Sequence, residues 1–285
     1  MRFSVWLKVS RPGLWTTAMW FYLLPVGGMD MFQDPAFYIG LFYVTLPLGM
    51  FIYGWNDFTD YATDQINPRK DSYLFGARLT ERERTKLPLR ILAVQLPFFI
   101  YFLVAEGPKI IALFAVAAIA VTLNNWPRVG MKNWPCLDLL IQSSYLLVFV
   151  LSSWLNGAPQ LPWQTFVFGA AFAMHSHLFG AVMDIEPDAK AGRKTTAVVL
   201  GRMRSKILIG IALIAEAFWV HIWFGETVVA TVLVIGAIWF IIDATLLLKD
   251  RPYPARYASF LLVCWNVAAV TSAPWVWYTA AFAKA

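Results

Sequence analysis

The chain of 285 residues is 59% hydrophobic, 16% aromatic and only 14% charged, with a formal net charge of +6. Soluble domains usually carry about 25% charged residues and about half apolar ones, so the composition excludes an ordinary soluble protein. A membrane-spanning helix needs roughly 20 apolar residues, which leaves room for about nine such helices. We therefore expect a polytopic, all-α membrane protein with a single domain over residues 1–285.

The apolar runs between charges and Pro or Gly breaks predict nine helices. In chain order they cover residues 12–28, 35–56, 88–105, 109–126, 136–156, 163–183, 206–224, 227–248 and 256–282. Basic residues precede the first run, but no small-residue cleavage pattern follows it. This favours a retained first span over a removed signal peptide.

Positive charge is concentrated on alternate connections between these helices. The N-terminus and the loops after the second, fourth, sixth and eighth helices hold 3, 7, 2, 6 and 3 Lys or Arg residues, 21 of the 23 in the chain. Cytoplasmic loops of membrane proteins carry such an excess. The pattern predicts a cytoplasmic N-terminus, and it explains the net charge without a nucleic-acid partner. The absence of a transit peptide fits a prokaryotic cell membrane.

Two acidic clusters follow the second and sixth predicted helices, on the side predicted to be cytoplasmic. The first reads NDFTDYATD from Asn56 to Asp64, and the second reads DIEPD from Asp184 to Asp188. If the second helix continues through the first cluster, residues 56, 57, 60 and 64 project at about 0, 100, 40 and 80 degrees and share one face. Asp184 and Asp188 also share a face, although Pro187 between them would weaken or end the helix.

The chemistry of these clusters indicates a metal and phosphate site. Hard oxygen ligands without His or Cys suit Mg²⁺, which takes one or two carboxylates and completes its shell with water and substrate phosphate. Basic loops follow both clusters and would neutralise phosphate oxygens. Charges at membrane ends also mark the water interface in many proteins. Two such clusters on one side, one of them led by Asn, favour the functional interpretation.

Both clusters resemble motifs of the UbiA superfamily of intramembrane prenyltransferases. NDFTDYATD fits the NDxxDxxxD motif, and DIEPDAKAGRKTTAVVLG fits the second Asp-rich motif with its trailing Gly and Thr. The resemblance implies a helical bundle around a central cavity, a lateral opening to the bilayer, and Mg²⁺ bridging the clusters to a prenyl diphosphate. The implied metal ligands are Asn56, Asp57, Asp60, Asp64, Asp184 and Asp188, with Asp57 ranked lowest and Asp60, Asp64, Asp184 and Asp188 also counted as catalytic. The implied diphosphate contacts are Lys132, Arg128, Arg69, Lys70, Arg193 and Lys194; which member of each loop pair points inward is left open.

The resemblance also implies a reaction. The diphosphate leaves, and an allylic carbocation forms in a dry, aromatic cavity and is captured by a lipophilic acceptor. NPRK and GRKTTAVVLGR look closer to the lycopene elongase branch, whereas the Arg-Pro pair and Tyr-containing segment of quinone-pathway members are missing. We expect a carotenoid or polyene acceptor first and an aromatic quinone precursor second. A membrane terpene cyclase with the same ionising site and a non-catalytic lipid-phosphate binder or transporter are the alternatives.

Some polar residues inside apolar stretches lie outside these motifs. His175 and His177 diverge by about 200 degrees on one helix and are expected to pack or form hydrogen bonds rather than share a metal. Asp138 lies near the cytoplasmic end of its helix and is expected to orient Lys132. Glu216 and Asp243 are expected to be protonated or bonded between helices, because an unpaired charge there is costly.

Overall fold

The computed structural model describes residues 2–127 and 129–284, and these are helical apart from turns, loops and one isolated β-bridge between Ser72 and Gly76. The α-helices are α1 (Phe3–Ser10), α2 (Trp15–Leu23), α3 (Pro35–Tyr43), α4 (Leu46–Thr59), α5 (Tyr61–Ile66), α6 (Glu81–Glu106), α7 (Lys109–Asn125), α8 (Leu137–Leu140), α9 (Leu147–Leu155), α10 (Trp163–Met183), α11 (Ile185–Lys190), α12 (Thr196–Leu200), α13 (Arg202–Phe224), α14 (Thr227–Thr245) and α15 (Ala255–Thr279). Short 3-10 helices are η1 (Pro12–Leu14), η2 (Met131–Asn133), η3 (Ile141–Leu146) and η4 (Ala281–Ala283).

Seven helical segments within the described ranges are long and apolar enough to cross a membrane. They correspond to seven of the nine predicted helices. The predicted helix over 109–126 is α7, which is apolar but only 17 residues long. The predicted helix over 12–28 is the shorter pair η1 and α2, which ends at Leu23, ahead of Pro25. Nine spans are therefore not confirmed, although both shorter segments exist as helices.

Two predicted helices are interrupted. The segment over 35–56 divides into α3 and α4 at Val44 and Thr45, where Pro47 stands in the first turn of α4 and has no amide hydrogen to continue the preceding helix. The segment over 136–156 passes through the 3-10 stretch η3. In contrast, α6 begins at Glu81, seven residues before the predicted start at 88, because Thr80 and Glu83 form a capping box at its N-terminus.

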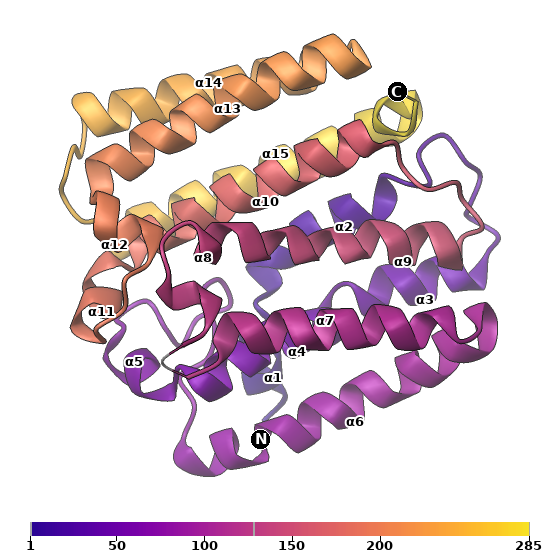
Figure 1. Cartoon of the computed structure of the whole chain (residues 1–285), viewed down its shortest axis with the longest axis horizontal. Coiled ribbons are helices and arrows are strands. Elements are labelled where there is room, and N and C mark those ends of the chain that lie inside the picture. Colours follow the sequence, from indigo (N-terminus) through magenta and orange to yellow (C-terminus); the bar gives the residue numbers. More distant parts are fainter. Residues whose placement is uncertain (1, 128, 285) are drawn as a thin grey trace.

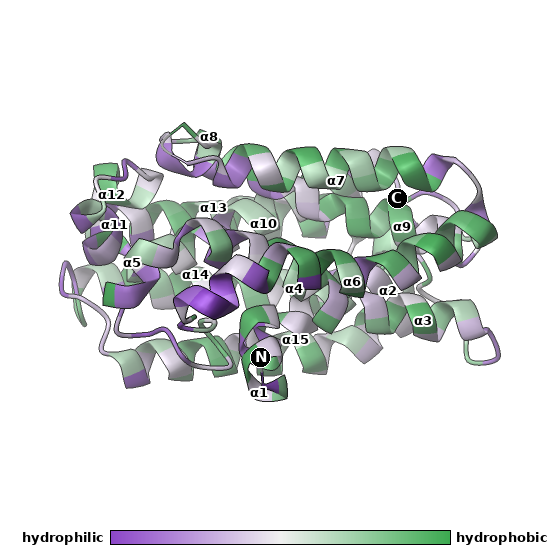
Figure 2. Ribbon diagram, turned by 90° about the horizontal axis from the view of Figure 1, so that it is seen from below, coloured by the Kyte–Doolittle hydropathy of each residue, from purple (hydrophilic) through white to green (hydrophobic). Residues whose placement is uncertain are grey.

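The long helices lie side by side, and α5, α11 and α12 gather at one end of the bundle, far from the C-terminus (Figure 1). Hydrophilic residues colour the helices and loops at this end, whereas the long helices are mostly hydrophobic (Figure 2). Both acidic clusters therefore lie at the same end. This common end is what the charge distribution predicts, while the side of the membrane stays a prediction.

Buried polar side chains connect the helices. Lys206 of α13 and Asp243 of α14 are fully buried and form an ion pair at 2.8 Å. His175 of α10 lies 2.7 Å from Glu216 of α13, Nδ1 to Oε1. The predictions that Asp243 and Glu216 bond between helices and that His175 forms a hydrogen bond are confirmed. These contacts hold α13 against its neighbours on both sides.

Two apolar pockets lie between helices of the described residues. The first is lined by residues of α3, α4, α7, η3 and α9. The second is lined by residues of α2, α10, α13, α14 and α15. The first pocket thus belongs to the N-terminal part of the chain and the second mainly to the C-terminal part. The central cavity is not confirmed.

Candidate active site

The first acidic cluster lies where α4 gives way to α5. The helix α4 ends at Thr59 and α5 begins at Tyr61, so the continuous helix assumed from the sequence is interrupted at Asp60. Backbone hydrogen bonds nevertheless continue through the break, from Asp60 N to Asn56 O at 2.8 Å and from Asp64 N to Asp60 O at 2.9 Å. The turn is therefore preserved, and the polar side chains stay near one face.

Asp57 and Asp64 share a lysine. The Nζ of Lys70 lies 2.7 Å from Asp57 Oδ1 and 2.7 Å from Asp64 Oδ2. Asp57 also accepts a hydrogen bond from Arg11 at 2.9 Å. Both Asp57 and Lys70 are buried, so these are ion pairs shielded from water. Asp57 therefore binds two cations and serves to fix the loop that carries Lys70.

Asp60 is the centre of the second set of contacts. It forms ion pairs with Lys132 and, at 2.5 Å, with Arg193. The amide of Asn56 donates a hydrogen bond to its other oxygen at 2.9 Å. Lys132 and Arg193 come from loops 61 residues apart in the chain. The geometry shows that both loops converge on a single carboxylate.

The second acidic cluster follows α10. Asp184 lies between α10 and α11, and Pro187 occupies the first turn of α11, where a proline is tolerated because no amide hydrogen is needed there. Asp188 N donates to Asp184 O at 2.9 Å, which preserves the turn. The proline therefore does not separate Asp184 from Asp188.

Cations from both halves of the chain bridge the two clusters. Arg193 pairs with Asp188 at 3.0 Å as well as with Asp60. Asp184 pairs with Arg69 and accepts a hydrogen bond from Asn67 at 2.8 Å. The two clusters therefore lie close together, since they share Arg193, and the loop that follows the first cluster contacts Asp184 through Arg69 and Asn67.

The environment shifts the carboxyl pKa values in opposite directions. Burial alone raises the pKa of Asp60, but the adjacent Lys132 and Arg193 outweigh it and hold that pKa below its usual value. Burial raises the pKa of Asp64 to about 7 and that of Asp188 to about 7, and neighbouring carboxylates add to both shifts. The cations therefore favour the ionised form of Asp60, whereas burial favours the protonated forms of Asp64 and Asp188.

The donor set fits Mg²⁺ chemically. Within residues 2–127 and 129–284, no three acidic, His or Cys side chains are grouped closely enough to enclose a metal alone. Mg²⁺ typically takes only one or two protein carboxylates, and its other ligands are water and phosphate oxygens. Asp60 and Asp188, bridged by one guanidinium, are oxygen donors of this kind. A bound cation would also favour the ionised forms of Asp64 and Asp188.

The structure separates the members of the predicted basic pairs. Arg69, Lys70, Lys132 and Arg193 each contact an acidic residue of the clusters. Lys194 is exposed, so Arg193 is the inward member of its pair. Arg69 and Lys70 both point inward. Arg128 lies outside the described residues.

Three further polar residues contact the clusters and were not predicted. Arg11 binds Asn56 and Asp57, Asn67 binds Asp184, and Asn125 Oδ1 accepts hydrogen bonds from Asn56 and Lys132. Asn67 stands in the quoted NPRK sequence, and Asn125 precedes WPR, so a polar residue beside each basic motif was the available signal. For Arg11, the sequence offered no signal beyond its position before an apolar run.

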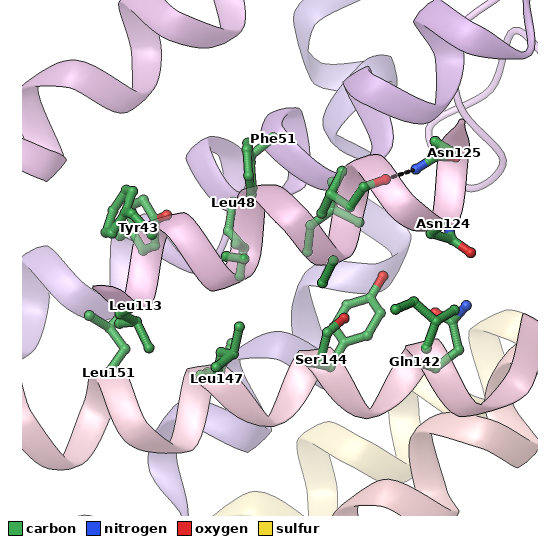
Figure 3. A pocket seen from close by; sticks show the side chains of 18 residues that line it. Tyr43, Leu48, Phe51, Leu113, Asn124, Asn125, Gln142, Ser144, Leu147 and Leu151 are labelled. Atoms are coloured by element: carbon green, nitrogen blue, oxygen red, sulfur yellow. Dashed lines mark hydrogen bonds between the residues drawn. The ribbon is translucent and has the colours of Figure 1, made fainter. Parts of the chain in front are cut away.

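Asn125 connects the clusters to the first pocket. It is the last residue of α7, is buried, and also lines the pocket. Asn124, Asn125, Gln142 and Ser144 lie at the end near the clusters, whereas Tyr43, Leu113 and Leu151 lie at the far end (Figure 3). The pocket therefore passes from a polar end beside the carboxylates to an apolar end within the bundle.

Comparisons with known proteins agree with this geometry. A model of the UbiA prenyltransferase family matches residues 14–267. A lycopene elongase/hydratase of Haloarcula japonica is 34% identical over 203 residues, which cover 68% of this chain and 66% of that protein. A 4-hydroxybenzoate octaprenyltransferase of Neisseria meningitidis is 26% identical over 99% of this chain and 94% of that protein. The chain thus spans just under two thirds of the Haloarcula protein.

A solved structure shares the fold. The structure of a UbiA homolog from Archaeoglobus fulgidus bound to DMAPP and Mg²⁺ aligns with a TM-score of 0.68 over 94% of this chain and 99% of that chain. The sequence identity is 20%, so the similarity concerns the arrangement of the helices.

Proposed function

The chain belongs to the UbiA prenyltransferase family, and from this premise we propose that it transfers an isoprenoid group from a prenyl diphosphate to a lipophilic acceptor. The observation that carries the proposal is the pair of acidic clusters at one end of the bundle, joined by Arg193 and adjoining an apolar pocket at Asn125. A charged head and an apolar chain fit the two ends of this arrangement. The whole chain would act as one catalytic domain.

Mg²⁺ is the metal that fits the donor set. Asn56, Asp60 and Asp64 would hold one Mg²⁺ ion, and Asp184 with Asp188 would hold another, whereas Asp57 binds Arg11 and Lys70 instead. When bound, Mg²⁺ neutralises charge that develops on the leaving diphosphate. Support for this assignment comes from the Archaeoglobus fulgidus homolog, which was solved with Mg²⁺ and with DMAPP or GPP.

The chain's own cations would bind the diphosphate. Lys132 and Arg193 meet at Asp60, while Arg69 and Lys70 reach the clusters from the loop after α5. Arg193 can offer two nitrogens to phosphate oxygens. As the C–O bond breaks, these groups stabilise the charge that moves onto the diphosphate.

The first pocket would hold the prenyl chain of the donor. Its lining is mainly apolar and aromatic beyond the polar end, so it excludes water from an allylic cation that water would otherwise capture. Along α7, the 12 residues from Asn125 to Leu113 rise by about 18 Å. A chain of a few isoprene units fits this length.

A carotenoid or other polyene is the acceptor we favour. Two relatives over 30% identical are called lycopene elongase/hydratase, and the second pocket is lined almost entirely by apolar and aromatic residues. An aromatic quinone precursor is the second choice, in line with the more distant 4-hydroxybenzoate octaprenyltransferase.

The N-terminus and the site would face the cytoplasm.

Pyrophosphate release tests the proposal. Purified protein with Mg²⁺, geranylgeranyl or dimethylallyl diphosphate and lycopene should release pyrophosphate and form a prenylated product detectable by mass. Asp60→Asn should lower this turnover at least about 100-fold, in the range seen when a stabilising group is removed from an active site. The matched control is Asp71→Asn, since Asp71 is exposed and forms an ion pair with Lys8, outside both clusters.

Each outcome separates the possible functions. Pyrophosphate release without any acceptor, with a cyclic product, would identify a terpene cyclase. Binding of the diphosphate without its cleavage under every acceptor tried would identify a lipid-phosphate binder. Full turnover by Asp60→Asn would refute the assignment of the site.

A further inference from the structure

Asp138 is a fully buried carboxylate that touches none of the acidic clusters. It lies in α8, and its side chain has no exposed surface. The sequence suggested that it orients Lys132. In the structure, the side-chain contacts of Asp138 are to Thr196: it accepts hydrogen bonds from the backbone N at 2.8 Å and from the hydroxyl of that residue. A carboxylate in the apolar interior is stable only with such partners.

The contact joins two loops of the active site. Thr196 follows Arg193 by three residues, and Asp138 follows Lys132 by six. The hydroxyl of Thr196 also accepts a hydrogen bond from Cys136 N at 2.8 Å. Three hydrogen bonds of Thr196, two to Asp138 and one to Cys136, therefore join the segment that follows Arg193 to the segment that follows Lys132. Thr196 and Asp138 are 58 positions apart in the chain.

The same tie lies next to the first pocket. The backbone carbonyl of Asp138 accepts a hydrogen bond from Gln142 Nε2 at 2.9 Å, and Gln142 lines the polar end of that pocket. Asp138 thus connects the loop of Lys132, the loop of Arg193 and the wall beside the clusters. The other end of both loops is fixed at Asp60, which both cations contact.

We propose that Asp138 is a positioning residue that sets the separation of Lys132 and Arg193, so that both cations reach one diphosphate. The inference rests on the proposed function only for the identity of the ligand, a diphosphate. Without the tie, both cations can still pair with Asp60, but that contact alone no longer fixes the separation of the two loops. Loss of the tie therefore weakens the binding of a diphosphate, because a diphosphate contacts both cations at once.

A double-mutant cycle on pyrophosphate binding tests this. The probe is Mg²⁺ with inorganic pyrophosphate, and its Kd is measured by calorimetry on the detergent-solubilised full chain for the wild type, Asp138→Asn, Lys132→Gln and the double variant. Asp138→Asn should weaken binding about tenfold. Because it acts through Lys132, it should cost less than about threefold in the Lys132→Gln background. Equal losses in both backgrounds, or no loss in the wild type, would overturn the proposal.

Two controls separate positioning from stability. Asp243 is also fully buried and ion-paired, but its partner is Lys206, which belongs to neither cluster. Asp243→Asn should lower thermal stability and leave the Kd for pyrophosphate unchanged. Thr196→Val, which keeps the backbone donor and removes the hydroxyl, gives a milder variant if Asp138→Asn does not fold. It should weaken binding several-fold, whereas Thr196→Ser should restore it; a Thr196→Val protein that binds like the wild type refutes the tie.

The Kd for pyrophosphate is measured without turnover, so the test of Asp138 does not require an active enzyme. If the wild type releases no pyrophosphate from any prenyl diphosphate, the proposed function fails while the binding cycle still decides the role of Asp138. If the wild type turns over and the cycle is additive, the inference alone fails. With an active enzyme, kcat/KM for the donor should follow the same non-additive pattern.

Discussion

Adjacent basic residues at this site have different surroundings. Arg193 forms ion pairs with Asp60 at 2.5 Å and Asp188 at 3.0 Å, whereas its neighbour Lys194 is exposed to solvent. Because Arg193 lies between two carboxylates, we expect a bound phosphate to replace one of these carboxylates as a partner of its guanidinium. The planar guanidinium can keep one contact while offering its other nitrogens to a phosphate.

This difference gives a matched pair of variants. Arg193→Ala should lower kcat/KM for the prenyl diphosphate about 100-fold or more, because two carboxylates and the diphosphate lose their shared cation. Lys194→Ala should stay within about twofold of the wild type. Steady-state kinetics on both proteins check this, and equal losses for the two would show that the loop acts only through its overall charge.

The residues of the two acidic motifs could be found from the sequence, because carboxylates are rare in a chain this apolar and their spacing is visible. Which basic residue points inward could not, since Arg193 and Lys194 differ by one position and only the course of the loop decides between them. Arg11 was missed for a similar reason. It contacts Asp57, 46 residues away, and nothing local to it indicates that contact.

At the level of single helices, the hydrophobicity of the sequence predicted where the helices lie in the chain better than whether each helix is continuous. The bounds of α10, Trp163–Met183, agree with the predicted range 163–183. The predicted helices over 35–56 and 136–156 are interrupted. An apolar run indicates that a segment is buried in the membrane, but it does not indicate where the backbone hydrogen bonding of a helix changes. The 3-10 segment η3 turns Gln142, Ser144 and Tyr145 toward the first pocket. Such local changes depend on packing against other helices.

The far end of the first pocket is expected to limit the donor's length. Leu113 of α7 is buried there, beside Tyr43 and Leu151 (Figure 3). Leu113→Ala should let the enzyme accept a prenyl chain about one isoprene unit longer, and Leu113→Trp should restrict it to shorter donors. Relative kcat/KM for a series of prenyl diphosphates measures the change.

The control for this prediction is in the other pocket. Leu233 of α14 is buried to a similar degree and lines the second pocket. Leu233→Ala should lose comparable stability, about 2 to 5 kcal/mol for such a cavity, without altering donor preference. If both variants shift the preferred length equally, the first pocket does not hold the donor chain.

Across the whole molecule, the bundle places its charged chemistry at one end and keeps apolar space behind it. Buried ion pairs hold this end together, and breaking such a pair by removing one partner is usually costly. The ion pairs of Asp57 with Lys70 and of Asp60 with Lys132 lie there with little exposure to water. The stability of that end therefore depends in part on Asp60, which is also one of the carboxylates that we propose bind Mg²⁺.

The pH dependence of the protein should show this link. The pKa of Asp64 and that of Asp188 are each raised to about 7 from 3.8, so the folded state holds protons that the unfolded chain has released. Without divalent metal, stability should therefore fall as the pH rises from about 4 to about 7, and then level off. Mg²⁺ needs the ionised carboxylates, so its affinity should rise over pH 6 to 8 with release of protons. Thermal unfolding in detergent, with and without Mg²⁺ at each pH, measures both trends. Asp188→Asn should flatten both, and a stabilisation by Mg²⁺ that is independent of pH would contradict the assignment of these carboxylates to the metal.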